Sequence, residues 1–92
     1  MLNDDCQTIF DVFVPMARDY LESPGIMAAL ELDKICMQLY PMVARNLGNM
    51  ELSNRIRDFG RNLPRKNTDE LRVLFKDILS LGQSAGLKIT KN

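Results

Sequence analysis

Apolar residues recur along the whole chain at steps of three and four, which is the spacing of one face of an α-helix. This spacing predicts four helices, over roughly residues 4–21, 24–47, 49–63 and 68–85. No stretch alternates apolar and polar residues as a half-buried strand would, and no segment is repeated. Because short loops between helices favour antiparallel neighbours, the sequence predicts an all-α protein. We expect an antiparallel four-helix bundle, formed by a single domain over residues 1–92.

The apolar stripes of the four helices define the expected core. In chain order they are Cys6, Ile9, Phe10, Phe13, Ala17, Tyr20 and Leu21; Ala28, Leu32, Ile35, Cys36, Leu39, Val43 and Leu47; Leu52, Ile56, Phe59 and Leu63; and Leu71, Leu74, Phe75, Ile78 and Leu81. Three of the six methionines, Met27, Met37 and Met42, lie on the second helix. Methionine fills gaps in cores more often than it lines partner surfaces, so we expect these three to pack inside. An adaptable partner surface is the alternative.

Prolines and a glycine mark the ends of the first two helices. Pro15 lies inside the first helix, where it removes a hydrogen bond and predicts a kink or a break into two pieces. Ser23 and Pro24 have the order of an N-cap and a first helical residue, so they predict the start of the second helix. Pro41 interrupts that helix near its end, and Gly48 is expected to terminate it.

The fourth helix has a signal at each end. Asn67 and Glu70 have the spacing of a capping box, with Thr68 as a competing cap one residue later. Gly86 is the expected C-cap, and Leu87 is expected to fold back as the apolar contact that accompanies such a cap.

The composition narrows the possible functions. The 92 residues include no histidine and two cysteines. Without histidine neither a Ser-His-Asp nor a Cys-His site can form, so we expect no enzyme activity, no structural metal and no cofactor. The first residues lack the features of a secretory signal, and no apolar run is long enough to cross a bilayer, so we expect a cytoplasmic protein. In that compartment Cys6 and Cys36 are expected to be free thiols, with a disulfide between them as the alternative.

The formal net charge is zero, but the charges are unevenly divided. Residues 1–33 hold seven acids and one base, whereas residues 34–92 hold eleven bases and five acids. Five bases fall within twelve positions, on the third helix and the loop after it: Arg55, Arg57, Arg61, Arg65 and Lys66. A solvated helix face is one interpretation, and a binding surface for an anionic partner is the other. Nucleic acid is not the expected partner, because the bases are not interleaved with aromatic residues in the way single-strand binders require.

Three stretches follow one another in an informative order. They are Leu32-Asp33-Lys34-Ile35 with Leu39, then Leu52-Ser53-Asn54-Arg55-Ile56 with Phe59, and finally Leu74-Phe75 with Ile78 and Leu81-Gly82-Gln83-Ser84-Ala85-Gly86-Leu87. In this order they resemble the immunity proteins of pediocin-like (class IIa) bacteriocins, especially the enterocin A immunity type, which has a similar Gly-x-Ser/Thr-Ala-Gly-Ile/Leu ending. Together they cover roughly residues 24–87.

The resemblance implies a cytosolic four-helix bundle that protects a bacteriocin producer against its own peptide. Members of this family are thought to bind the mannose phosphotransferase permease from the cytoplasmic side once the bacteriocin has engaged it. Specificity is attributed to the C-terminal half. The expected partner-binding residues of this chain are therefore Arg55, Arg57, Arg61, Arg65, Lys66, Lys88, Ile89 and Lys91. We expect a monomer that contacts the permease–bacteriocin complex, with peripheral contact to the inner face of the membrane.

A second class of function stays open. A helical bundle without catalytic groups also suits a small regulatory partner, such as an anti-activator or a secretion chaperone. Such a protein acts by protein–protein binding, through an apolar groove or by self-association. Sedimentation separates the two classes, because this alternative predicts a dimer and the immunity function predicts a monomer.

Overall fold

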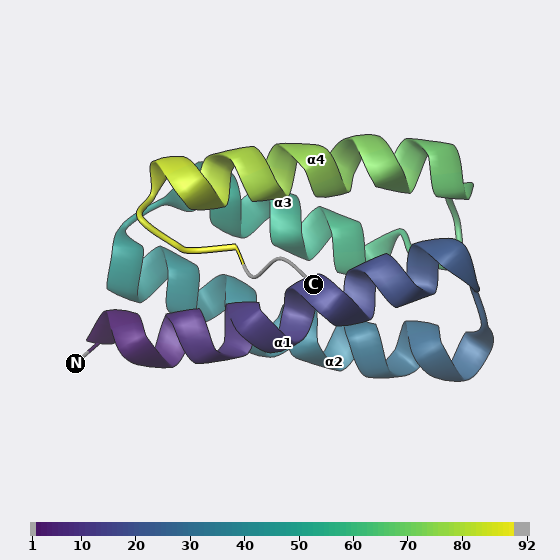
Figure 1. Ribbon diagram of the computed structural model, residues 1–92, viewed down its shortest axis with the longest axis horizontal. Coiled ribbons are helices and arrows are strands. Elements are labelled where there is room, and N and C mark those ends of the chain that lie inside the picture. Colours follow the sequence, from purple (N-terminus) through teal and green to yellow (C-terminus); the bar gives the residue numbers. More distant parts are fainter. Residues whose placement is uncertain (1, 90–92) are drawn as a thin grey trace.

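Four α-helices connected by short loops pack as an antiparallel bundle, which confirms the predicted fold class (Figure 1). The computed structural model describes the backbone of residues 2–89 and the side chains of residues 5–89. The elements are α1 (Leu2–Glu22), α2 (Ile26–Met42), a π-helical turn η1 (Val43–Leu47), α3 (Met50–Arg61) and α4 (Thr68–Ser84). Among the helices that lie side by side, backbone contacts are most extensive between α2 and α3 and least extensive between α1 and α4. The molecule measures 34 × 26 × 20 Å.

The four predicted stripes meet in one core. All their members are buried, except six that are partly buried against it: Ile9, Ala28, Ile35, Leu47, Leu74 and Leu81. Four phenylalanines lie at its centre. The ring centroid of Phe13 is 5.8 Å from that of Phe59 and 6.0 Å from that of Phe10 and from that of Phe75. These contacts connect α1, α3 and α4 through aromatic pairs, each worth about 0.5–1.5 kcal/mol beyond the area that it buries.

Asparagine caps start α3 and α4, and the cap at Asn67 is the one that the sequence predicts. The side chain of Asn49 accepts a hydrogen bond from the Leu52 amide at 2.9 Å, and that of Asn67 accepts one from the Glu70 amide at 2.9 Å. Gly48, between η1 and α3, has φ 63°, a left-handed conformation that glycine adopts without strain. These caps satisfy amides that the first turn of a helix leaves without partners.

The prediction that Pro15 kinks or splits the first helix is wrong in its stronger form, because α1 continues through it from residue 2 to residue 22. The adjacent Val14 and the nearby Ala17 are both buried, so packing on either side of the proline holds the two halves in one helix. Pro41 has a larger effect. Two residues after it, α2 gives way to the π-helical turn η1.

The predicted start of α2 at Ser23 and Pro24 is also wrong. The Ser23 amide still donates to a carbonyl of the last turn of α1, that of Asp19, at 2.9 Å. Ser23 therefore ends one helix and cannot cap the next. Gly25 takes the N-cap position instead, and its carbonyl accepts the first hydrogen bond of α2, from the Ala29 amide at 2.9 Å.

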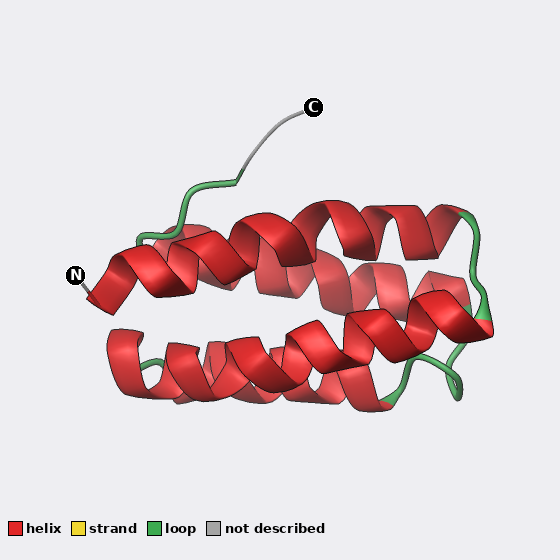
Figure 2. Cartoon of the chain, turned by 90° about the horizontal axis from the view of Figure 1, so that it is seen from below, coloured by secondary structure: helices red, strands yellow, loops and turns green. Residues whose placement is uncertain are grey.

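The C-terminal segment turns back at the end of α4, as predicted. Gly86 has φ 98°, and the Leu87 amide donates to the Gly82 carbonyl at 2.9 Å, a pattern that ends helices with a left-handed glycine. Leu87 is buried in the core. The Gln7 side chain then binds both backbone groups of Lys88, each at 2.8 Å, so the segment returns beside the start of α1 (Figure 2).

Helices α2 and α3 approach each other closely at Gly60. A Cβ atom at this position would lie 2.8 Å from the Cys36 Cβ and 2.9 Å from an Asp33 carboxylate oxygen. Gly82 has a similar role between α4 and α1, where the added atom would lie 3.0 Å from the tip of the Phe10 ring. Small residues at these two positions allow the helices to pack at short range.

Candidate partner-binding surface

The bases of α3 lie on two different flanks of the helix. Arg55 faces α4 and forms ion pairs with Asp77 at 3.6 Å and with Glu51 at 3.9 Å. Arg57 and Arg61 face α2 instead, where both line a hollow between α2 and α3. Helix geometry explains this division. Residues two apart, such as Arg55 and Arg57, point about 200° from one another, and residues four apart, such as Arg57 and Arg61, about 40°. The bases of α3 therefore do not form one face. Two arginines lie beside α2, and the third, beside α4, is already ion-paired.

The remaining predicted bases near α3 lie in the loop that leads to α4. Arg65 and Lys66 are both exposed, and Lys66 forms an ion pair with Glu70 at 3.6 Å. Ion pairs of this exposed kind contribute about 0–1 kcal/mol. Within the part of the chain that the structure describes, no ion pair is found for Arg61 or Arg65, so their charges remain available to a partner.

The predicted tail residues lie far from this loop. Lys88 is exposed and Ile89 is partly buried against the core, while Lys91 lies outside the described residues. The loop bases precede α4 and the tail residues follow it, so the 17 residues of α4, about 25 Å of helix, separate the two groups. The structure therefore does not bring the predicted site residues together at one place.

The hollow between α2 and α3 has a volume of about 170 Å³ and is lined by Asp33, Cys36, Met37, Tyr40, Arg57 and Arg61. The Nε atom of Arg57 is buried there, and no residue in the described part of the chain accepts a hydrogen bond from it. Its ion-pair contact, an oxygen of Asp58, is 4.0 Å away. A buried donor without an acceptor carries a desolvation cost.

Both cysteines are free thiols and both are buried, as predicted. Burial raises the pKa of the Cys6 thiol. Burial, and secondly the negative charge of Asp33, raise the pKa of the Cys36 thiol to about 12. Since the thiolate is the reactive form, neither cysteine is suited to act as a nucleophile near neutral pH.

The prediction that the methionines of α2 pack inside is wrong for Met27 and Met37, whose exposed fractions are 71% and 60%. Helix α2 carries apolar residues on two opposite faces, and its inner face already fills the core with residues such as Leu32 and Leu39. The outer face also exposes Ile26 at 80% and Leu30 at 55%. We name Ile26, Met27, Leu30 and Met37 the α2 outer stripe.

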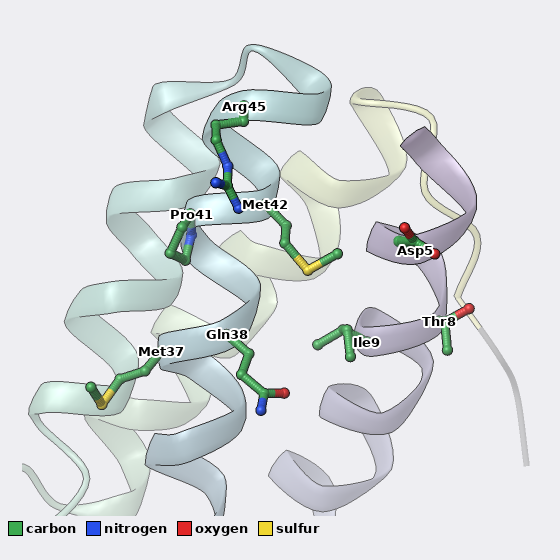
Figure 3. A pocket seen from close by; sticks show the side chains of 8 residues that line it. All are labelled: Asp5, Thr8, Ile9, Met37, Gln38, Pro41, Met42 and Arg45. Atoms are coloured by element: carbon green, nitrogen blue, oxygen red, sulfur yellow. The ribbon is translucent and has the colours of Figure 1, made fainter. Parts of the chain in front are cut away.

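A groove of about 540 Å³ runs between the first half of α1 and the second half of α2. In Figure 3 the side chains of Ile9, Gln38 and Met42 point into it, and Met37 points toward the opposite side of α2. Asp5 of α1 and Arg45 of η1 add one charge of each sign to its lining. The groove therefore suits an apolar side chain better than a charged one.

These surfaces offer charged and apolar groups that a partner could contact. Among the residues that the structure describes, no three His, Cys, Asp or Glu side chains gather as a metal site. None of the helices described combines the length and apolar content that crossing a membrane requires. In three comparisons with known proteins, no family model, no curated protein and no solved structure matches this chain.

Proposed function

We propose that this protein is an immunity factor that protects a bacterial cell against a pediocin-like bacteriocin. It acts by binding, without catalysis, to the mannose phosphotransferase permease that the bacteriocin has engaged, on the cytoplasmic side of the membrane. The observation that carries this proposal is the ordered set of three stretches that resemble this family. They lie on three consecutive helices of a four-helix bundle, the architecture that the resemblance implies.

The first two stretches pack against each other in the bundle. The first lies on α2 and the second on α3, and their apolar members Leu32, Leu52 and Ile56 are fully buried in one core. Between these helices the Ser53 hydroxyl donates to the Tyr40 carbonyl at 2.7 Å. The apolar residues that carry the resemblance therefore build the bundle, as expected if the family shares one scaffold. The choice of bacteriocin is then left to surface residues.

The third stretch has a structural function that accounts for its small residues. Gly82 permits the close approach of Phe10, Gly86 adopts the left-handed conformation, and Leu87 enters the core. A chain that ends in this way holds its C-terminal segment against α1. This geometry supports the proposal because the family attributes specificity to its C-terminal half, which needs a defined position to be read by a partner.

The direct test is a challenge of bacteriocin-sensitive cells that express this chain. We expect the minimum inhibitory concentration of at least one pediocin-like peptide to rise relative to cells with an empty vector. A Leu52→Asp variant, which places a charge in the core, is the matched control and should give no protection. Unchanged sensitivity to every peptide of a broad panel, with the wild-type chain folded in the cells, would refute the proposal.

A small regulatory partner is the second candidate, and the α2 outer stripe is the observation that favours it. Four large apolar residues on one exposed face are unusual for a monomer with no partner. Sedimentation velocity distinguishes the candidates in the absence of any ligand. A stable dimer favours self-association of a regulatory protein, and a monomer favours the immunity function.

A further inference from the structure

A recess of about 360 Å³ opens along the contact between α1 and α4, the least extensive contact between neighbouring helices. The C-terminal segment covers the other end of this contact, where Gln7 binds Lys88. The residues that line the recess are Arg18, Leu21 and Glu22 of α1, and Arg72, Phe75, Lys76 and Leu79 of α4. On each helix they include positions i, i+3 and i+4, which lie on one face. We name this site the α1–α4 recess.

The floor of the α1–α4 recess is apolar. Leu21 and Phe75 belong to the core, and Leu79 is partly buried against it. The volume lies within the range of small-molecule sites, about 300–1,000 Å³, which combine an apolar lining with a few polar groups. Along α4 the lining extends over seven steps, from Arg72 to Leu79, or about 10 Å of helix. This length suits a short aliphatic chain.

The rim of the recess is positively charged. Among the residues described there, Arg18, Arg72 and Lys76 are bases and Glu22 is the acid. Arg72 and Lys76 are exposed one turn apart on α4, and neither has an ion pair within the described part of the chain. Asp69, one turn before Arg72, is exposed and does not line the recess. The rim therefore favours a ligand with a negative charge.

Arg72 is held in place by the end of α1. Its Nη2 atom donates a hydrogen bond to the Leu21 carbonyl at 3.0 Å, in partly buried surroundings. This carbonyl belongs to the last turn of α1, where carbonyl groups lack partners within the helix. A guanidinium has five N–H donors in one plane, so others remain for a carboxylate. Because the group is oriented before a ligand arrives, binding loses less side-chain entropy.

We propose that the α1–α4 recess binds a small aliphatic carboxylate, of the class of medium-chain fatty acids. The carboxylate lies between Arg72 and Lys76, and the charge of Arg18 attracts it from the α1 side. The alkyl chain lies over Phe75 and continues to Leu79, one turn further along α4. The bases select the charged head and the floor selects the chain, so a ligand with only one of these parts binds weakly.

The probe is octanoate, titrated into the ¹⁵N-labelled full chain. We expect saturable shifts of backbone amides around residues 18–22 and 72–79, with the millimolar affinity that a ligand of this size can reach. Octanol has the same chain without the charge, and butyrate has the same charge with a shorter chain. Each should bind about tenfold more weakly than octanoate, because each lacks either the charged hydrogen bonds or part of the apolar contact.

Charge changes on the rim test the assignment of residues. Arg72→Gln and Lys76→Gln should each weaken octanoate binding about tenfold. Lys76→Gln leaves the bond from Arg72 to Leu21 intact, so it removes a charge without altering the contact between the helices. Glu22→Gln removes the acid of the rim and should strengthen the binding. Arg65→Gln is the matched control, because this exposed arginine lies outside the recess, and it should leave the affinity unchanged.

Circular dichroism establishes that the variants keep the fold. Equal binding of octanoate and octanol would overturn the proposal, as would equal effects of Lys76→Gln and Arg65→Gln. The absence of saturable shifts with octanoate would also overturn it. Binding to phosphatidylglycerol vesicles that depends on Lys76, without binding to octanoate, would instead make the recess a membrane contact. The titration contains neither bacteriocin nor permease, so its failure is distinct from a failure of the immunity function.

Discussion

The close approach of α2 and α3 at Gly60 leads to a prediction that runs against helix propensity. In the interior of an exposed helix, glycine to alanine stabilises by about 1 kcal/mol. At Gly60 the added methyl group would lie 2.8 Å from the Cys36 Cβ, a distance that real Cβ atoms essentially never show. We therefore expect Gly60→Ala to destabilise the protein.

The size of the effect depends on which atom the added methyl group would clash with. Adding a methyl group to a packed core costs about 1–3 kcal/mol. The Cys36 Cβ is attached to the backbone and cannot rotate away, so the upper part of this range applies and the two helices must separate. After subtraction of the gain in helix propensity, the net loss is about 2 kcal/mol. For a domain of this size, that loss lowers the melting temperature by about 8–16 °C.

Urea and thermal unfolding followed by circular dichroism measure this loss, and a double-mutant cycle locates it. Cys36→Gly removes the Cβ atom with which the methyl group would clash, so Gly60→Ala should lower the stability far less in that background. Cys36→Ala keeps the Cβ and should retain most of the cost. Gly82→Ala is a useful comparison, because its nearest neighbour is the tip of the Phe10 ring, which can tilt, and we expect a smaller loss.

Two results would refute this reasoning. If Gly60→Ala raised the melting temperature, α2 and α3 could not lie so close that the added methyl group would be 2.8 Å from the Cys36 Cβ. If its cost were the same with alanine and glycine at position 36, the loss would arise elsewhere than at this contact.

Three further predictions test other parts of the account. Asn67→Ala removes the cap of α4 and should lower the free energy of unfolding by about 1 kcal/mol in urea titration; no change would mean that the cap contributes nothing. The raised pKa of Cys36, about 12 against 9.0 for an ordinary thiol, gives stability that is complete below pH 9 and lost as pH rises toward 12, because the unfolded thiol ionises first. Cys36→Ala should flatten this part of the stability curve, and an unaltered slope would contradict the assignment. Changing Arg57 and Arg61 together to glutamine should reduce protection against the bacteriocin at normal helicity, whereas Arg55→Gln should not; equal effects would contradict a surface on the α2 flank.

The local features of the fold could be predicted from the sequence. Asn67 and Gly86 mark the ends of α4 through short-range chemistry, in which a side chain or a left-handed backbone satisfies groups a few residues away. The core stripes are predictable for the same reason, since one face of a helix repeats within a few turns. Ser23 shows the limit of this approach. Its preference for a cap position was overridden because its amide remained bonded to the preceding helix.

The candidate site was harder to predict because it depends on how helices are placed around one another. Periodicity shows that α2 has two apolar faces, but only the packing shows that the face with Met37 is left uncovered. The hydrogen bonds from Gln7 to Lys88 join residues 81 positions apart, and nothing local signals them. The separation of Arg55 from Arg57 was predictable in principle from the 100° per residue of a helix, although their closeness in sequence suggested one patch.

The function proposed here depends most directly on one measurement, the ratio of minimum inhibitory concentrations for bacteriocin-sensitive cells with and without this chain. The ratio should rise at least tenfold for one or a few pediocin-like peptides and stay at one for bacteriocins of other classes. A ratio of one for every pediocin-like peptide, from cells in which the chain is folded and abundant, would contradict the immunity function.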